Sequence, residues 1–383
     1  MAAAPAQETW STRCAALDDA LGKALAEARL VGAVLIVMQG GEIVYRRAVG
    51  LADRESHRPM TVDTLFRYSS LTKPIVAAAA LVLVEQGTLE LHEPVTRWIR
   101  TFRPSLADGT PATISIHHLL THTSGLSYPF NEASPDGPYH QADVCDGIGS
   151  SGLTLDENVA RIASAPLDFA PGESWQYSVS TDVLGSVIEH ATGEALPSVV
   201  SRLVTEPLGM NDTAFQVADR ARLAAAYGDG TPEPLLMGEG HVVPGSLIEF
   251  SPGRAFDPTA FPSGGAGMIG SAPDFVHFLE LIRTGGGPIL TPATAALMMG
   301  NQLGDLTVDD RPGEGHSYGG SVIMDPDAAG VPHSPGTCWW GGIYGHRWFV
   351  DPTLGVTLAL LTNTAIEGLF GKLADDVVAA TRT

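Results

Sequence analysis

Ser70 and Lys73 stand three residues apart, a spacing that lets a hydroxyl and an amine act together. On a helix this spacing brings their Cβ atoms to roughly 5–6 Å from each other on one face. Because proline is tolerated only in the first helical turn, Pro74 places the helix start close to Ser70. The unpaired N–H groups and positive dipole end of that turn favour a developing serine alkoxide. The stretch therefore predicts a nucleophilic serine beside a lysine that can hold a proton or stabilise negative charge.

The scarcity of lysine makes this pair more informative. The sequence has three lysines, Lys23, Lys73 and Lys372, against nineteen arginines. Arginine cannot give up its proton in a protein, whereas lysine can. Taken alone, the pair still fits a capping serine and an exposed lysine on an ordinary helix equally well, so other parts of the chain must decide.

A second candidate is Tyr177, in the segment 172–178 (GESWQYS). A glycine-containing turn followed by alternating large residues presents this tyrosine from a loop. A tyrosine near a cation can have a lowered pKa and act as a general base. The alternative is a half-buried aromatic side chain whose hydroxyl is hydrogen-bonded.

The third candidate is the segment 338–345 (CWWGGIYG), an aromatic strand with the sequence Trp340-Gly341-Gly342. Its glycines remove side chains where another group could approach the backbone closely. A substrate carbonyl beside this strand could accept its N–H groups, which would complete an oxyanion hole. The alternative is a strand that is simply kinked or bulged at glycine.

Three further patterns lack the context that their chemistry needs. The glycines of 265–270 match a dinucleotide fingerprint, but no buried strand precedes them. Ser317 lies in a Gly-x-Ser-x-Gly pattern without the strand before it and the helix after it that a nucleophile elbow requires. His117, His118 and His122 show no metal-binding spacing, so we expect no metal, and we expect His122 to bond the backbone of its own turn.

Composition limits the partners and the compartment. The net charge of −21 argues against binding to nucleic acid or to an anionic membrane surface. The sequence has no run of about twenty apolar residues, so we expect no membrane span. The first twelve residues do not read as a signal peptide. Cys14, Cys145 and Cys338 are far apart and odd in number, which indicates reduced thiols. These observations favour a cytoplasmic protein and leave its oligomeric state open.

The order of the expected elements predicts one sheet built from both ends of the chain, because the termini of a fold usually meet. We assign residues 1–95 and 252–383 to an α/β sheet domain and 96–251 to a mainly helical, loop-rich insertion, with a cleft between them. The run 124–152 is expected to be a long ordered loop. The expected helices include 12–30, 71–86, 158–163, 183–191, 196–204, 274–283 and 365–381; the expected strands are 31–38, 43–49, 318–324, 340–344, 347–350 and 356–361.

In order and spacing, the three motifs resemble those of the serine hydrolase superfamily that includes class C β-lactamases, penicillin-binding proteins and family VIII carboxylesterases. Ser70-Leu71-Thr72-Lys73 comes first, Tyr177-Ser178 follows about a hundred residues later, and Trp340-Gly341-Gly342 lies near the C-terminus. Segments 119–125 and 263–274 also resemble that group. The resemblance implies a β-lactamase/transpeptidase-like fold of the α/β (α+β-like) class, with an antiparallel sheet flanked by helices and a mainly helical inserted domain.

The third motif separates the branches of this superfamily. β-Lactamases and penicillin-binding proteins typically carry Lys-Thr-Gly there, whereas Trp340-Gly341-Gly342 resembles the carboxylesterase branch. Val179 also replaces the asparagine of the class C β-lactamase motif Tyr-x-Asn. The resemblance therefore implies a serine carboxylesterase for short-chain or hydrophobic esters. The alternatives are an acyltransferase that uses the same acyl-enzyme, or a class C-like β-lactamase or D-peptidase.

The implied mechanism needs no metal and no organic cofactor, and its partner is a small-molecule ester. Ser70 attacks the ester carbonyl, and Tyr177 and Lys73 transfer the proton; which of the two is the base stays open, because coupled groups titrate as a unit. By analogy, the backbone N–H groups of Ser70 and Ile343 form the oxyanion hole. The residues expected to bind substrate are Trp340, Gly341, Gly342 and, from their place in the long loop, Tyr128 and Phe130.

Overall fold

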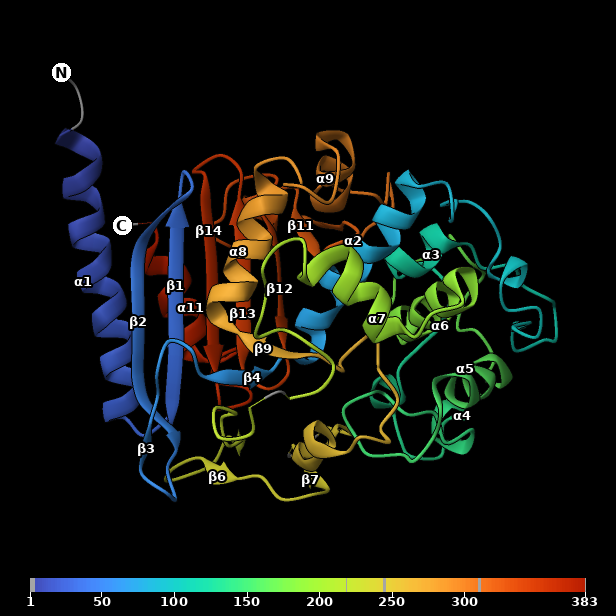
Figure 1. Cartoon of the computed structure of the whole chain (residues 1–383), viewed down its shortest axis with the longest axis horizontal. Coiled ribbons are helices and arrows are strands. Elements are labelled where there is room, and N and C mark those ends of the chain that lie inside the picture. Colours follow the sequence, from blue (N-terminus) through green and yellow to red (C-terminus); the bar gives the residue numbers. More distant parts are fainter. Residues whose placement is uncertain (1–3, 218, 244–245, 309–310, 383) are drawn as a thin grey trace.

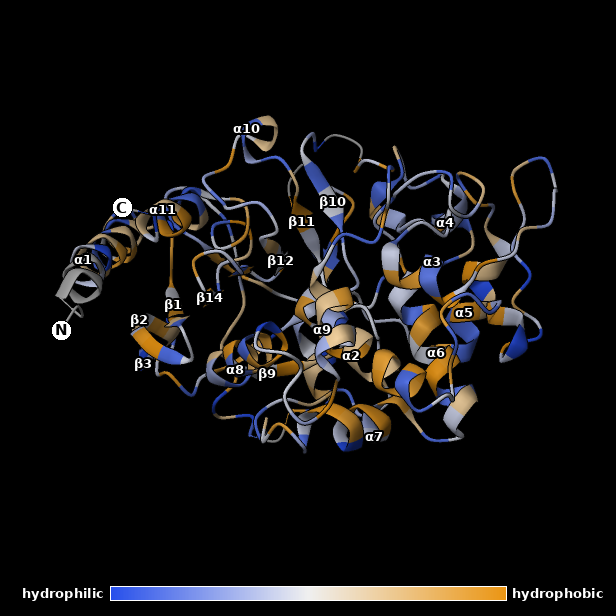
Figure 2. Ribbon diagram, turned by 90° about the horizontal axis from the view of Figure 1, so that it is seen from above, coloured by the Kyte–Doolittle hydropathy of each residue, from blue (hydrophilic) through white to orange (hydrophobic). Residues whose placement is uncertain are grey.

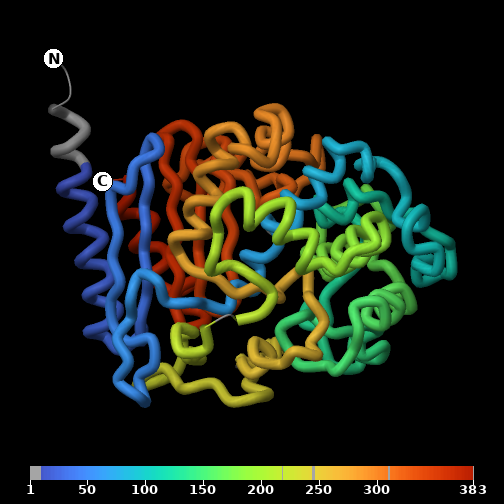
Figure 3. Tube along the Cα trace, in the orientation of Figure 1, coloured from blue at the N-terminus to red at the C-terminus, as the bar shows by residue number. Residues whose placement is uncertain are grey.

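An antiparallel sheet forms the centre of the computed structural model, which describes residues 4–217, 219–243, 246–308 and 311–382. Its strand order in the described residues is β10-β11-β12-β13-β14-β1-β2-β3, so strands from the two ends of the sequence lie side by side (Figures 1 and 3). The strands are β1 (Gly32–Gln39), β2 (Glu42–Asp53), β3 (Arg58–Pro59), β10 (Glu314–His316), β11 (Ser321–Ile323), β12 (Cys338–Gly342), β13 (His346–Asp351) and β14 (Val356–Thr362).

Helices cover both faces of this sheet, and the alternation along β1 explains how. Leu35 packs with helices α1 (Ala4–Ala26) and α11 (Lys372–Ala380), while Val34 and Ile36 join the larger core on the opposite face. That opposite face is covered by α8 (Ala272–Arg283), as Figure 2 shows. Since successive strand residues point to opposite faces, apolar side chains on both sides of β1 require a helix layer on each.

A mainly helical region lies beside the sheet, with α2 (Thr72–Glu85) buried where the two meet (Figure 1). Its small alanine side chains, 77–80, let neighbouring helices approach closely on all sides. The other helices of this region are α3 (Ile116–Thr121), α4 (Pro138–Gln141), α5 (Leu155–Ser164), α6 (Ser180–Thr192) and α7 (Leu196–Val200).

The remaining elements are short. Two strands, β4 (Leu65–Arg67) and β9 (Ile269–Ser271), pair directly before the Ser70 turn and before α8. The others are β5 (Tyr227–Gly228), β6 (Leu235–Leu236), β7 (His241–Val242), β8 (Glu249–Phe250), α9 (Pro292–Met299) and α10 (Pro326–Ala329), with 3-10 turns at Ser69–Leu71, Val95–Arg97, Pro129–Asn131 and Pro252–Phe256 and a π-helical turn at Ser201–Thr205. Among the described residues, no helix combines the length and the apolar character needed to cross a bilayer.

The predicted antiparallel sheet with flanking helices is confirmed, and the differences are local. The first helix begins at Ala4 instead of residue 12, and only 321–323 of the expected strand 318–324 belong to the sheet. The closing helix begins at Lys372 instead of residue 365. The N–H groups of Leu369, Phe370 and Gly371 all donate to the Ile366 carbonyl, and these bonds form a compact turn before the helix.

The expected division of the chain at residues 95 and 252 stays a prediction. Both ends of the chain contribute strands to one sheet, and the helices α3 to α7 lie between them in sequence. Part of the expected insertion also bonds to the sheet side, because Ala225 N donates to the Ala52 carbonyl (2.8 Å) and Tyr227 N donates to that of Asn363 (2.9 Å).

Candidate active site

Ser70 lies in a 3-10 turn, Ser69–Leu71, that leads directly into α2. Its neighbour Ser69 has φ 45°, a region that residues other than glycine rarely adopt. The Ser69 hydroxyl donates to the carbonyl of Tyr68 (2.7 Å), and the buried Tyr68 hydroxyl donates to that of Ser271 (2.6 Å). Unusual backbone of this kind persists only where its surroundings hold it, and it gathers at functional sites.

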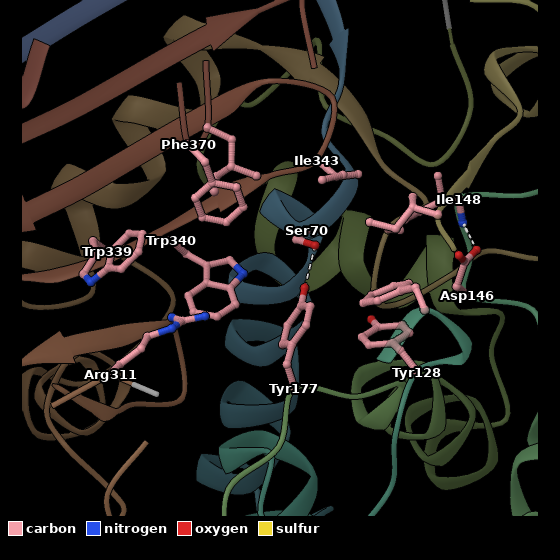
Figure 4. A pocket seen from close by; sticks show the side chains of 15 residues that line it. Ser70, Tyr128, Asp146, Ile148, Tyr177, Arg311, Trp339, Trp340, Ile343 and Phe370 are labelled. Atoms are coloured by element: carbon pink, nitrogen blue, oxygen red, sulfur yellow. Dashed lines mark hydrogen bonds between the residues drawn. The ribbon is translucent and has the colours of Figure 1, made fainter. Parts of the chain in front are cut away.

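The structure brings the three residues of the first two motifs together. The hydroxyls of Ser70 and Tyr177 are 2.6 Å apart, and Lys73 Nζ donates to Ser70 Oγ at 3.3 Å (Figure 4). Lys73 is buried, and its ammonium lies 4.6 Å from the centre of the Tyr177 ring. A short path for a proton therefore connects Ser70 with a phenol and an amine.

Lys73 is held from behind by the glycine-rich segment. Its Nζ donates to the Gly265 carbonyl at 2.9 Å, a role that the sequence pattern did not reveal. Asp182 lies nearby and accepts from the Ser263 hydroxyl at 2.6 Å. Burial raises the pKa of Asp182, while the Ser263 hydrogen bond and the Lys73 charge oppose that rise.

The expectation for His122 was wrong. Its Nδ1 does not bond its own turn but lies 3.1 Å from Ser178 Oγ and accepts from the Ser178 N–H at 3.2 Å. Burial holds the pKa of His122 well below its usual value, so the ring is neutral and can accept. His122 thus fixes the segment that carries Tyr177.

The end of strand β12 abuts the Ser70 turn. A Cβ at Gly342 would lie 2.5 Å from the Tyr68 carbonyl oxygen and 2.6 Å from Ser69 Oγ, so only glycine permits this approach. Ile343 follows, and Figure 4 shows it on the same side of the pocket as Ser70. The N–H of Ile343 donates to no group among the described residues, which leaves it available to a ligand.

Ser70 and Tyr177 open into a pocket of about 200 Å³. We name its two sides the tryptophan wall (Arg311, Trp339, Trp340, Gly341, Leu369 and Phe370) and the loop wall (Tyr128, Phe130, Asp146, Ile148 and Ile248). Figure 4 shows the labelled members of the two walls on opposite sides of Ser70. The remaining lining residues are Ala266 and Ile343.

The lining contains the expected residues Tyr128, Phe130, Trp340 and Gly341 but not Gly342. Gly342 serves as the point of approach to the Ser70 turn. No motif surrounds Arg311, so no sequence pattern predicts its place in the pocket. Phe370 was missed because its turn was assigned to the closing helix.

Aromatic rings supply much of both walls. Tyr128 and Phe130 stack with ring centres 4.4 Å apart, and the Tyr177 ring lies 5.1 Å from those of both Tyr128 and Trp340. Burial raises the pKa of the Tyr128 hydroxyl well above its usual value, so it stays protonated. An apolar, aromatic surface of this kind suits uncharged esters.

One charged side chain lies in each wall. The Arg311 guanidinium carbon lies 5.1 Å from the centre of the Trp340 ring, and Nη1 is 3.8 Å from a Glu314 carboxylate oxygen. On the other side, Asp146 accepts from the N–H groups of Ile148 (2.8 Å) and Gly149 (3.0 Å). Burial raises the pKa of Asp146.

The patterns around Ser317 and His117 lie outside this pocket. Ser317 is buried in the turn between β10 and β11, where its hydroxyl donates to the Gly320 carbonyl at 2.9 Å. His117 Nδ1 lies 2.9 Å from the Tyr318 hydroxyl oxygen. Within the described ranges, no three His, Cys, Asp or Glu side chains are grouped in a way that could hold a metal ion.

Comparison with known proteins gives the class. The family model described as Beta-lactamase matches residues 17–382, so the chain belongs to the beta-lactamase family. Esterase EstB from Burkholderia gladioli is 52% identical over 365 residues, which cover 94% of this chain and 92% of that protein. The predicted resemblance to this superfamily and to its esterase branch is thereby confirmed.

Solved structures agree in fold. The structure of "EstCE1, a hydrolase with promiscuous acyltransferase activity" has a TM-score of 0.92 and 40% identity, covering 99% of this chain and 100% of that one. Simvastatin synthase (LovD) from Aspergillus terreus has a TM-score of 0.76 over 97% of this chain and 98% of its own, but only 21% identity, so it supports the fold alone.

Proposed function

We propose that the protein is a serine carboxylesterase that hydrolyses short-chain or hydrophobic esters. The observation that carries the proposal is the contact of Ser70 Oγ with the Tyr177 hydroxyl (2.6 Å) and with Lys73 Nζ (3.3 Å) at an apolar pocket. The 52% identity to a protein named Esterase EstB supports an ester as the substrate.

In the proposed reaction Tyr177 acts as a phenolate that the Lys73 ammonium stabilises, and it accepts the proton of Ser70 while Ser70 Oγ attacks the ester carbonyl. Tyr177 then protonates the departing alcohol, and water cleaves the acyl-enzyme by the reverse proton path. Lys73 holds positive charge beside the phenol and the serine throughout. The shorter contact favours Tyr177 as the direct proton acceptor, with Lys73 as its electrostatic partner.

Negative charge on the carbonyl oxygen needs preorganised donors. The proposed donors are the backbone N–H groups of Ser70 and Ile343. Loss of one such donor typically costs about 2.7–4 kcal/mol of transition-state stabilisation in other hydrolases. Gly342 supports this role indirectly, because it lets the strand end reach the Ser70 turn.

The test is hydrolysis of p-nitrophenyl butyrate by Ser70→Ala, with Ser317→Ala as the matched serine control. Ser70→Ala should lose turnover while keeping its thermal unfolding midpoint, and Ser317→Ala should keep turnover when folded. Retained turnover in Ser70→Ala, or loss confined to Ser317→Ala, would overturn the proposal. Lys73→Ala and Tyr177→Phe should each lower kcat at least about a hundredfold.

Acyl transfer is the second candidate function, because the structure of EstCE1 is titled a hydrolase with promiscuous acyltransferase activity. Transfer would use the same Ser70 acyl-enzyme, with an alcohol in place of water. Adding 1-butanol to the vinyl butyrate reaction and measuring butyl butyrate by gas chromatography separates the two reactions. Butyrate alone as product supports hydrolysis as the dominant activity.

We also propose a small-molecule ester as the partner and the cytoplasm as the compartment. The free thiols of Cys14, Cys145 and Cys338 support a reducing environment. Cell fractionation with an antibody against the native protein tests the compartment, and recovery outside the cytoplasmic fraction would contradict it.

A further inference from the structure

Among the side chains that the structure describes, Phe370 is the most exposed large apolar one, at 61%, and it lies in the lining of the pocket. An exposed phenylalanine is informative mainly where it adjoins a binding site. Figure 4 shows its ring above that of Trp340, another member of the tryptophan wall. Because Phe370 is 61% exposed and lines the pocket, a ligand in the pocket can reach its side chain.

The turn that carries Phe370 is firmly held. The N–H groups of Leu369, Phe370 and Gly371 share the Ile366 carbonyl at 3.0, 2.8 and 2.9 Å. Asp229 accepts from Ile366 N (2.6 Å) and Glu367 N (2.9 Å) and so anchors the start of the turn.

The end of the turn is fixed as well. Glu367 accepts from the N–H of Leu373 at 3.0 Å, which joins the turn to the first residues of α11. Phe370 therefore holds its place at the pocket without packing against a core.

The third motif contributes to this placement. Leu369 packs against Gly341, where a Cβ would collide with the Leu369 side chain and with the His346 carbonyl oxygen. Gly341 thus leaves room on β12 for the side chain of Leu369, which directly precedes Phe370 in the chain. The glycine pair of the motif has two separate tasks: Gly342 meets the Ser70 turn and Gly341 meets the Phe370 turn.

The surfaces that face this side of the pocket are flat π-systems. Trp339 and Trp340 lie next to each other with ring centres 6.0 Å apart, and the Arg311 guanidinium lies over both rings. Guanidinium planes and aromatic faces both stack with flat rings. A saturated ring of the same size would fill the space but would gain little from these faces.

We propose that Phe370 determines specificity: its ring stacks on a flat aromatic ring of the ester substrate. That substrate ring also lies against the other residues of the tryptophan wall. The proposal rests on the proposed esterase function and names its preferred substrates: esters with an aryl group on one side of the carbonyl. Stacked aromatic pairs contribute enough to change kcat/KM about two- to tenfold.

The test uses two pairs of esters, each a flat ring matched with a saturated one: benzyl acetate with cyclohexylmethyl acetate, and methyl phenylacetate with methyl cyclohexylacetate. Initial rates are followed by pH-stat titration for the wild type, Phe370→Leu and Phe370→Trp. Phe370→Leu should lower the aryl-to-saturated ratio of kcat/KM about two- to tenfold in one pair, and Phe370→Trp should preserve it. The responding pair shows whether the alcohol or the acyl group meets Phe370.

Leu235→Ala is the control, because Leu235 is similarly exposed (57%) but lies outside the pocket lining, and it should leave all four rates unchanged. Equal loss for flat and saturated rings in Phe370→Leu would overturn the stacking proposal while esterase activity stands. If the wild type hydrolysed none of the four esters or p-nitrophenyl butyrate, the proposed function itself would fail.

Discussion

The tryptophan wall and the loop wall face the same serine but are held by different means. Trp340 lies on β12, where it pairs with Trp348 of β13, and β12 is hydrogen-bonded to strands on both sides. Most of the loop wall, Tyr128 to Ile148, lies in the long segment between α3 and α5, and Ile248 directly precedes the short strand β8. The start of the loop wall is fixed by side chains instead: the Tyr139 hydroxyl accepts from Ser127 N (2.9 Å) and Asn131 Nδ2 donates to the Tyr177 carbonyl (2.7 Å).

A buried amide holds the far end of the loop wall at Cys145. Asn158 Oδ1 accepts from Cys145 N (2.8 Å), and its Nδ2 donates to the Cys145 carbonyl (2.9 Å), directly before Asp146. The Asn158 side chain thus pairs with both backbone groups of Cys145, as a neighbouring strand would. The part of the tryptophan wall that lies on β12 should therefore resist the loss of one side chain, whereas the loop wall should not.

The largest effect on turnover should come from closing the approach of β12 to the Ser70 turn. In Gly342→Ala the new Cβ meets Tyr68 O and Ser69 Oγ and displaces Ile343 from Ser70. A misplacement of about 1 Å can cost about a hundredfold, so kcat for p-nitrophenyl butyrate should fall at least that far. Gly22→Ala, which meets nothing within 4 Å, is the control and should keep full turnover. Normal turnover in Gly342→Ala would remove the structural basis for the proposed oxyanion hole.

A different response is expected when the amide that holds the loop wall is removed. Asn158→Ala leaves the buried N–H and C=O of Cys145 unpaired, so the free energy of unfolding should drop by about 2–4 kcal/mol. Turnover of the protein that remains folded should fall less than tenfold, because Ser70 and β12 stay in place. Urea denaturation and p-nitrophenyl butyrate hydrolysis measure the two quantities. The exposed Asn211→Ala serves as control; a stability loss equal to that of Asn158→Ala would contradict the account.

Acid should weaken the sheet side through its buried histidines. Burial lowers the pKa of His316 to about 3 and that of His346 to about 4, against about 6.5 when unfolded. The unfolded chain therefore binds more protons between pH 6.5 and pH 4, and stability falls as pH falls through that window. Each histidine contributes about 1.4 kcal/mol per pH unit there. Urea unfolding at pH 7.0 and 5.5 should show the fall, and His316→Gln should reduce it; an unchanged slope would contradict the assignment.

The smallest effect should come from the aromatic stack of the loop wall. Phe130→Leu removes a stacking partner of Tyr128 that contributes about 0.5–1.5 kcal/mol. We expect KM for p-nitrophenyl butyrate to rise about two- to tenfold with kcat nearly unchanged. A fall in kcat as large as that of Gly342→Ala would show that the loop wall positions the reacting groups and does not only hold substrate.

The sequence predicted best what short segments determine. Ser70 and Lys73 share one helical turn, so their contact follows from spacing and from the helix start that Pro74 imposes. The strands around β1 and β14 follow from apolar runs of strand length. The contact of Tyr177 with Ser70 joins residues 107 positions apart, and only the resemblance to known motifs suggested it.

What the sequence did not predict depends on contacts between distant segments. Phe370 lies in a turn whose anchor, Asp229, is far away along the chain, so the local pattern of 365–381 predicts one continuous helix. His122 bonds Ser178 because two loops meet there, not because of its own turn. Arg311 reaches the pocket from the segment before β10, and no local pattern marks its place.

The most direct test of the central claim is to identify the residue that carries the acyl group during turnover. The protein is mixed with excess p-nitrophenyl butyrate, quenched with acid within milliseconds and digested, and its peptides are sequenced by tandem mass spectrometry. The account predicts a butyryl group on Ser70, absent from Ser70→Ala and present in Ser317→Ala. A butyryl group on another residue in the wild type, with Ser70 unmodified, would contradict it.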